Sequence, residues 1–179
     1  KQKELKTQEL PIKWIPKIFE LCKKLNIEFG CTVFYNTAIQ KLISYVNFLK
    51  ISSFDVKRTE LILNCLKTNL PIYISCGLLT NIEIRDFRKN LFHMNFHNYE
   101  LFHCRSEYPA KIEDIQMNRI NKLNLSGYSD HSASTSVIIA AIMQGAKYIE
   151  LHFDLDDKQG YETHYGHCWT ETAFKYLYH

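Results

Sequence analysis

Two side chains that could take part in chemistry, Glu150 and His152, occupy alternate positions in the apolar run Lys147–Phe153. Alternate side chains of a β-strand point to the same face, so the carboxylate and the imidazole are predicted to point together. Burying both groups in an apolar strand costs several kcal/mol unless a bound cation or a hydrogen-bond network compensates. A polar site is therefore predicted on this face of the strand.

A second imidazole, that of His131, lies just past the preceding apolar run, one predicted strand earlier. Two imidazoles on neighbouring strands could form the protein part of a site for Mn, Zn or Fe, with open coordination positions for substrate. For His152, the alternative is an ordinary core histidine with satisfied hydrogen bonds. Two ligands alone do not distinguish these interpretations.

Lys50 lies in the middle of another short apolar run, Asn47–Ser53, where a solvated lysine is unexpected. With the hydroxyls of Ser53 and Ser75, its ammonium would form a pocket suited to phosphate. Gly77 would allow backbone N–H groups to approach the same anion closely. The alternative is a lysine at a strand edge whose ammonium reaches solvent.

The other histidines and the cysteines carry weaker signals. His164 and His167 follow the last predicted strand, where they could be ligands or acid–base groups, or could belong to a lid or packing segment. His93, His97 and His179 are predicted to be surface residues. The six cysteines contain no CxxC pair, which argues against a zinc ribbon or a disulfide scaffold and predicts reduced, mostly buried thiols.

Six short runs of β-favouring apolar residues are predicted to be the strands that position these side chains. They are Ile27–Phe34, Asn47–Ser53, Pro71–Cys76, Tyr99–Arg105, Leu123–Ser129 and Lys147–Phe153. Amphipathic stretches of helical period lie between them, the last over Thr135–Gln144 with Gly145 as a helix stop. The alternation of strand and helix predicts an α/β fold with a parallel sheet.

The strand ends favour a barrel over an open sheet. No GxGxxG or Walker loop follows any run, which weakens an open nucleotide-binding fold. Nearly every run instead ends in polar residues: Thr32, Lys50, Ser53, Ser75, His103, Ser106, Ser129, Asp130, His131, Glu150 and His152. In a (β/α)8 (TIM) barrel these strand ends face one mouth, where active sites lie. Because six strands do not close such a barrel, the prediction is an incomplete TIM barrel that lacks two strands.

The composition suits one core and argues against several kinds of partner. The 179 residues are 46% hydrophobic, which is enough for one domain or for part of a larger one. A net charge of +3 is too small to indicate a nucleic-acid partner. No run reaches about 18 apolar residues and no basic-then-apolar leader is seen, so a cytoplasmic location without a membrane partner is predicted. The start at Lys1 rather than Met is expected of a segment of a longer chain.

Five segments, taken in order, resemble the strand motifs of the N-acetylneuraminate (sialic acid) synthase family. They are Lys50–Ser53 (KISS), Ile74–Gly77 (ISCG), Leu101–Ala110 (LFHCRSEYPA), Gly127–His131 (GYSDH) and Ile149–Asp156 (IELHFDLD). The resemblance assigns them to the fourth to eighth strands of a TIM barrel. It therefore implies that strands 3 to 8 are present and that strands 1 and 2 are missing.

The resemblance also implies a role for each candidate site residue. A divalent metal, Mn²⁺, Mg²⁺ or Co²⁺, would be held by His131 and His152. Phosphoenolpyruvate would be contacted by Thr32, Lys50, Ser53, Ser75, Ser106 and Ser129, with Tyr108 near the sugar and Asp130 in the substrate-binding set. Lys50 and Glu150 are the candidate catalytic residues.

The reaction implied by the resemblance forms a C–C bond. The methylene carbon of phosphoenolpyruvate attacks the metal-polarised aldehyde of an open-chain N-acetylmannosamine-type sugar; water then adds at the next carbon and phosphate leaves. The enzyme would be a transferase that makes a sialic acid or related nonulosonic acid and is a homodimer when full-length. Residues 1–179 would be a partial catalytic domain, without the family's C-terminal antifreeze-like domain and inactive alone.

Departures from the family pattern leave the acceptor sugar open. Ser106 stands where many members have asparagine, and Gly166–Trp169 replaces a Gly-Pro-Asp-His pattern after the last strand. Another metal-dependent TIM-barrel enzyme, an aldolase or a hydrolase, is one alternative, because the fold does not determine the chemistry. A catalytically inactive fragment with a binding or structural role is another.

Overall fold

The computed structural model describes residues 10–155 and 166–178, in which six strands form one parallel sheet. The strands are β1 (Gly30–Thr32), β2 (Phe48–Ile51), β3 (Ile72–Ser75), β4 (Tyr99–Cys104), β5 (Gly127–Asp130) and β6 (Tyr148–Leu151). They follow one another across the sheet in chain order, each parallel to the next. Each strand coincides with or overlaps a predicted run, so the α/β fold and the parallel sheet are confirmed.

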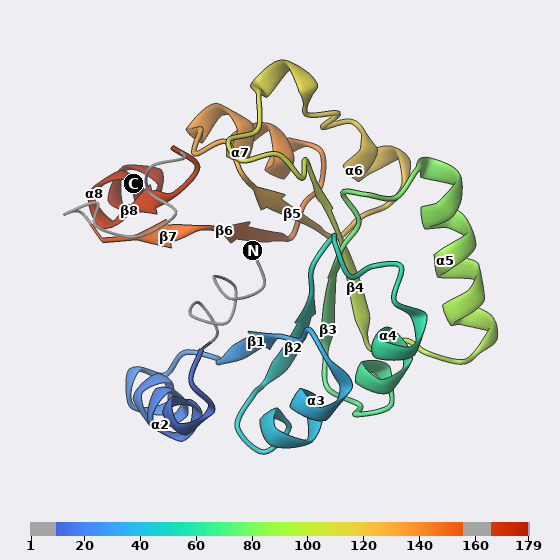
Figure 1. Ribbon diagram of the computed structural model, residues 1–179. Helices are drawn as coiled ribbons and strands as arrows, with labels where there is room; N and C mark the ends of the chain where they lie inside the picture. The colour runs from blue at the N-terminus through green and yellow to red at the C-terminus, as the bar shows by residue number, and fades with distance from the viewer. Residues whose placement is uncertain (1–9, 156–165, 179) are drawn as a thin grey trace.

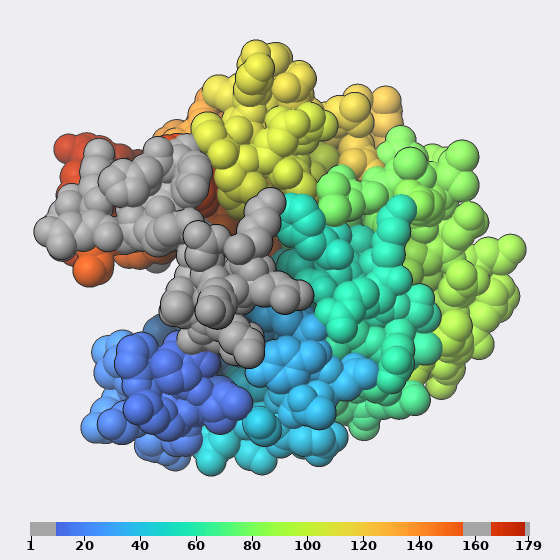
Figure 2. Space-filling view, viewed as in Figure 1, coloured from blue at the N-terminus to red at the C-terminus, as the bar shows by residue number. Residues whose placement is uncertain are grey.

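Helices connect the strands and cover one side of the sheet. They are η1 (Ile12–Trp14), α2 (Ile15–Leu25), α3 (Asn36–Leu42), α4 (Thr59–Leu66), α5 (Asn81–His93), η2 (Ile112–Asp114), α6 (Arg119–Lys122) and α7 (Thr135–Met143). The sheet curls, with α3 to α7 outside the curl and the edge strands β1 and β6 on the same side of the molecule (Figure 1). The side chains of these segments form a continuous outer surface around the curl (Figure 2). The result is a curled half-barrel, as expected for part of a TIM barrel.

Asparagine residues make the turns between helix and strand at four connections. Asn26, Asn69, Asn95 and Asn124 have positive φ angles of 54°, 61°, 60° and 48°. Asparagine tolerates this left-handed conformation better than most side chains and ends helices as glycine does. The turn at Asn124 makes β5 begin later than predicted, because the N–H of Leu125 still bonds to the carbonyl of Ile120 in α6.

Alternating side chains give the sheet two different faces. Leu49, Ile51, Ile72 and Ile74 are fully buried in one apolar cluster with residues of α4 and α5. Each such side chain contributes about 1.5–3 kcal/mol when it is removed from water. The residues between them, including Lys50, Tyr73 and Ser75, point to the inside of the curl. The core therefore lies between sheet and helices, and the inner face is left for polar and aromatic groups.

The chain after β6 returns to the end of that strand. β7 (Phe153–Asp154) pairs in parallel with β8 (Trp169–Thr170), and α8 (Glu171–Tyr178) follows. The backbone N–H of Trp169 donates to the carbonyl of His152 at 2.7 Å. Of the two histidines predicted to follow the last strand, His167 lies in this returning segment and His164 lies outside the described residues. His179, which is predicted to be a surface residue, also lies outside them.

Several simpler predictions can be compared directly with the structure. His93 and His97 are exposed, as predicted. All six cysteines are free thiols, with Cys65, Cys76 and Cys104 buried and the others half-buried. Gly145 has a φ of 99° directly after α7 and its C-cap Gln144, which confirms the predicted helix stop. None of the helices in the described ranges is long and apolar enough to cross a membrane.

Candidate active site

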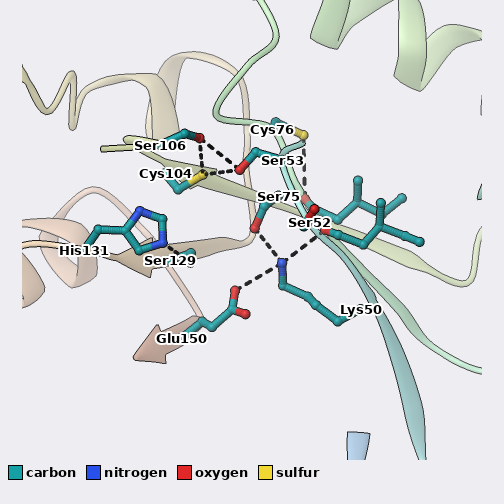
Figure 3. Close-up of polar contacts among 12 residues, drawn as sticks. Lys50, Ser52, Ser53, Ser75, Cys76, Cys104, Ser106, Ser129, His131 and Glu150 are labelled. Carbon is teal, nitrogen blue, oxygen red and sulfur yellow. Dashed lines mark hydrogen bonds and ion pairs between the residues drawn. The ribbon is translucent and has the colours of Figure 1, made fainter. Parts of the chain in front are cut away.

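Lys50 projects from β2 into the curl, and its ammonium lies among polar atoms of several strands (Figure 3). Its Nζ donates to Ser75 Oγ at 2.6 Å and to the Ile51 carbonyl at 3.1 Å, and it lies 3.3 Å from Glu150 Oε2. The residue is only 8% exposed, so a lysine that reaches solvent is excluded. A buried ammonium requires such partners, because desolvating an unpaired charge is very costly.

The ion pair between Lys50 and Glu150 depends on the curvature of the sheet. β2 and β6 are separated by three intervening strands, which in a flat sheet would place them roughly 19 Å apart. The observed 3.3 Å separation of Nζ and Oε2 shows that their side chains converge inside the curl. Nζ also lies 5.9 Å from the ring centroid of Phe102 on β4, within range of a cation–π interaction.

A cavity of about 480 Å³ opens onto this ion pair. Thr32 of β1, the register partner of Lys50, lines it together with Lys50 and Glu150. Aromatic rings also line it: those of Tyr73 and Phe102 have centroids 5.3 Å apart. The cavity therefore places a buried cation and hydroxyl groups beside a space that suits a small anionic molecule.

Side chains at the ends of β2 and β4 form a second polar group near Lys50 (Figure 3). Ser106 Oγ donates to Ser53 Oγ at 3.0 Å, and Ser53 Oγ lies 3.2 Å from Cys104 Sγ. Gly77 leaves room for this group, since an added Cβ would lie within 3.0 Å of Ser106 Oγ and Cys104 Sγ. Gly77 is thus required sterically at this position, whereas the approach of backbone N–H groups to an anion stays a prediction.

The ring of His131, just after β5, is held in one orientation. Its Nδ1 lies 2.5 Å from the carbonyl oxygen of Arg105, and because a carbonyl only accepts, Nδ1 carries the proton and Nε2 keeps its lone pair. Nε2 lies 3.5 Å from Ser129 Oγ. Burial lowers the pKa of His131, although the Arg105 carbonyl opposes this shift. The imidazole is therefore held in the neutral form that binds metals.

Aromatic rings from three segments meet beside His131. The ring centroids of His131 and His152 are 5.2 Å apart, and that of Tyr108 lies 4.1 Å from His131. The predicted meeting of two imidazoles at the end of neighbouring strands is confirmed. Within residues 10–155 and 166–178, no group of three or more His, Cys, Asp or Glu side chains is arranged to hold a metal. An ion bound here would need further ligands from water or substrate.

His167 also belongs to this cluster, which the sequence left undecided. Its ring centroid lies 4.8 Å from that of His152 and 5.0 Å from that of Tyr108, and the residue is 1% exposed. Its position depends on the return of the chain to β6, for which the sequence contains no spacing signal.

Asp130 is a predicted substrate-binding residue that the structure does not bring to the cavity. Because Ser129 and His131 face inward, the alternation along β5 turns Asp130 to the opposite face of the sheet. It is fully buried. Its carboxylate accepts hydrogen bonds from five donors: Tyr128 Oη, Ser132 N, Ser132 Oγ, Ala133 N and Trp169 Nε1. Its role in this structure is to hold the loop after β5.

Comparison with known proteins finds relatives over most of the chain. A profile of the NeuB family matches residues 1–178. The chain is 33% identical over 152 residues to pseudaminic acid synthase of Helicobacter pylori, covering 82% of this chain and 45% of that protein. It is 35% identical over 147 residues to N,N'-diacetyllegionaminic acid synthase of Legionella pneumophila, covering 76% of this chain and 41% of that protein.

The fold also resembles that of a related synthetase whose structure has been solved. This is the crystal structure of N-acetylneuraminic acid (sialic acid) synthetase from Leptospira borgpetersenii in complex with citrate, with a TM-score of 0.86 and 27% identity. The similarity covers 94% of this chain and 61% of that one. The chain thus spans less than half the length of the two curated relatives and under two thirds of the solved one.

Proposed function

We propose, since this chain belongs to the NeuB family, that it forms most of the catalytic domain of a nonulosonic acid synthase. Its relatives are named as pseudaminic acid, legionaminic acid and sialic acid synthases. The reaction that we assign to the complete protein condenses phosphoenolpyruvate with an N-acetylmannosamine-type amino sugar. The products are a nonulosonic acid and phosphate.

The observation that supports this proposal most strongly is the buried ammonium of Lys50 beside a cavity of about 480 Å³. Its hydrogen bond to Ser75 and the nearby hydroxyls of Ser53 and Ser106 provide charge and donors for a phosphate and a carboxylate. Thr32 lines the same cavity, and Ser129 Oγ lies 3.5 Å from His131 Nε2. Phosphoenolpyruvate carries both anionic groups, which matches such a pocket.

Each side chain has a proposed task in the condensation. Lys50 binds the anionic end of phosphoenolpyruvate and orients its methylene carbon toward the sugar aldehyde, where the new C–C bond forms. Glu150 holds Lys50 in place, and its carboxylate lines the cavity, where it can accept a proton from the water that adds to the next carbon. The phosphate then leaves from that carbon. Tyr108, against His131, would contact the sugar.

A divalent ion, Mn²⁺, Mg²⁺ or Co²⁺, is the proposed cofactor, and the two imidazoles fit it. The Arg105 carbonyl fixes the tautomer of His131 so that Nε2 can bind a cation, and the ring of His152 lies 5.2 Å away. When bound by His131 and His152, such an ion would polarise the aldehyde of the sugar. Imidazole ligands favour a transition-metal ion over Mg²⁺.

We further propose that the six strands correspond to the third to eighth strands of a closed (β/α)8 barrel. On this proposal, residues 1–179 are part of a catalytic domain that is inactive alone, and two βα units complete the barrel in the full protein. A homodimeric state and a cytoplasmic location are part of the same proposal. The acceptor sugar could be any of the amino sugars that such synthases use.

Phosphate release tests this function. The full polypeptide that carries this chain should release phosphate from phosphoenolpyruvate only when an N-acetylmannosamine-type sugar and a divalent metal are both present. A metal-dependent aldolase or hydrolase would instead turn over without phosphoenolpyruvate, and a catalytically inactive protein would release nothing. Either result would reject the proposal.

The metal assignment has its own test in the same assay. A chelator should abolish phosphate release, and His131→Ala or His152→Ala should each lose both activity and bound metal, because two imidazoles are the only proposed protein ligands. His97→Ala, at an exposed histidine outside the site, is the matched control. Parental metal content in either ligand variant would show that the assignment is wrong.

A further inference from the structure

Trp169 bonds to the segments that carry both histidines of the site. Its backbone N–H donates to the carbonyl of His152 at 2.7 Å. Its indole Nε1 donates to Asp130 Oδ2 at 2.9 Å, and Asp130 directly precedes His131. Trp169 is 2% exposed, so both bonds are protected from water. One residue of the returning C-terminal segment, through its backbone and its side chain, therefore connects the ends of β5 and β6.

On the β5 side, the bond from Trp169 completes a network that holds the loop after His131. Asp130 is a fully buried carboxylate, and its hydrogen-bond donors in the described part of the chain are all neutral groups. Each of these hydrogen bonds therefore helps to stabilise the buried negative charge. Through this carboxylate the backbone of Ser132 and Ala133 is fixed, and Ala133 is held at a positive φ of 49°. Movement of Asp130 would move His131 with it.

On the β6 side, the returning segment supports a strand at the edge of the sheet. Among the described strands, β6 pairs within its sheet with β5 only. His152 lies just past its end, and the chain there is held by the pairing of Phe153 with Trp169. The ring of His167, two residues before Trp169, packs against the His152 ring at 4.8 Å. The position of His152 therefore depends on where Trp169 is anchored.

We propose that Trp169 is a positioning residue that sets the separation and relative orientation of the His131 and His152 imidazoles. It acts through its indole bond to Asp130 and its backbone bond to His152. This inference rests on the proposed metal site only in taking these imidazoles as the ligands. Partners that orient a ligand without touching the metal commonly change metal affinity by about ten- to a hundredfold when they are removed.

The test compares two tryptophan variants of the full polypeptide that carries the chain. Trp169→Phe keeps an aromatic ring but removes the indole donor, and Trp14→Phe makes the same change at a 50% exposed residue of η1. Mn²⁺ binding to the metal-free proteins is titrated by the electron paramagnetic resonance signal of the free ion. Trp169→Phe should bind Mn²⁺ about ten- to a hundredfold more weakly, and Trp14→Phe should keep the parental affinity.

A double variant separates positioning from general stability. Asp130→Asn should weaken Mn²⁺ binding as well, and the combination with Trp169→Phe should cost less than the product of the two losses, because both changes break the same bond. A purely structural role would lower the melting temperature of the metal-free protein and leave the affinity of the folded protein unchanged. That result would overturn the inference.

A fluorescence measurement covers the case in which Trp169→Phe does not fold. Within residues 1–179 of the Trp14→Phe protein, Trp169 is the only tryptophan. With any tryptophan outside these residues replaced by phenylalanine, its emission reports on the connection between the two strand ends. Mn²⁺ should change this emission with the same midpoint as the resonance titration. If the parent binds Mn²⁺ but this emission does not respond, positioning by Trp169 is refuted. If the parent itself binds no Mn²⁺, the metal assignment fails as well.

Discussion

At the scale of single residues, the most unusual feature is a lysine buried on the inner face of a strand. Lys50 is retained there because Ser75, the Ile51 carbonyl and Glu150 surround its ammonium. Such an arrangement stabilises the fold little, since desolvation offsets much of the attraction between the charges. Its value lies in function, because the charge is already in place when an anion arrives.

Replacement of Lys50 by Met should weaken phosphoenolpyruvate binding and leave the metal site intact. The methionine retains much of the apolar stem, and loss of one charge-assisted contact costs about 1.5–3 kcal/mol, or about ten- to a hundredfold in affinity. Steady-state phosphate release with each substrate varied separately, together with metal analysis, measures both effects. Lys57→Met, which breaks an exposed ion pair with Glu83, is the control. Loss of metal in Lys50→Met would instead mark Lys50 as structural.

His103 makes the stability of the protein sensitive to acid. It is buried on the outer face of β4, and among the described residues neither ring nitrogen has a hydrogen-bond partner. Burial, reinforced by the positive charge of Arg119, lowers the pKa of His103 to about 4. In the unfolded chain the imidazole titrates near 6.5. Between about pH 6.5 and pH 4 the unfolded chain therefore takes up a proton that the folded protein does not.

The expected result is a loss of stability as the pH falls through this window. Each pH unit costs about 1.4 kcal/mol, which amounts to about 3 kcal/mol in total, whereas above about pH 6.5 this group has no effect on the slope. Urea unfolding at several pH values should show a flatter pH dependence for His103→Leu than for the parent. The control His97→Leu, at an exposed histidine, should keep the parental slope. An unchanged slope in His103→Leu would contradict the prediction.

At the scale of elements, the turns that precede the strands and the turns that follow them have different roles. Those that lead from helix to strand contain Asn26, Asn69, Asn95 and Asn124 and only reverse the chain. Those that follow the strands carry the site, as expected for a barrel whose active site lies at the C-terminal strand ends. The turn after β3 shows this most clearly, because Gly77 lies against the side chains of Cys104 and Ser106.

Gly77→Ala should raise the phosphoenolpyruvate requirement without removing the metal. The added Cβ would lie within 3.0 Å of Ser106 Oγ and Cys104 Sγ, so these side chains must move and the bond between Ser106 and Ser53 is lost. Loss of one such donor should cost about ten- to a hundredfold in affinity. Gly145→Asn, at a turn with a φ of 99° where an added Cβ meets nothing within 4 Å, strains the backbone without contacting the serine group, so it controls for a general loss of stability. Unchanged phosphoenolpyruvate kinetics would show that the serine group does not bind it.

At the scale of the whole molecule, the half-barrel leaves two sheet edges without a neighbour among the described strands. β1 and β6 each pair on one side only, and the space between their inner faces is part of the cavity beside Lys50. Apolar residues of α2 next to β1, including Leu21 and Leu25, are exposed. Unpaired strand edges and uncovered apolar surface both promote association.

Residues 1–179 produced alone should therefore associate or unfold without cooperativity. Analytical ultracentrifugation and thermal unfolding would measure this directly. A longer polypeptide that supplies two further βα units should give one defined, cooperatively unfolding species, because the edge groups of β1 and β6 then find partners. A sharp monomer with cooperative unfolding from residues 1–179 alone would contradict the prediction.

Much of the fold and part of the site followed from local rules that operate along the chain. Apolar runs about two dozen residues apart, with helical periods between them, were sufficient to predict the six parallel strands. Strand alternation placed Glu150 and His152 on one face. The same rule, applied to Ser129 and His131, turns Asp130 away from the substrate, whereas the motif resemblance places Asp130 in the substrate-binding set.

By itself, then, the sequence determined the order of the strands, the face on which each side chain lies and the family, because each depends on neighbours along the chain or on short motifs. Only the tertiary structure decided which side chains meet across the molecule. Curling of the sheet brings Lys50 of β2 to Glu150 of β6, and the return of the chain brings His167 and Trp169 to the histidines. These contacts join segments far apart in sequence, and no local periodicity specifies them.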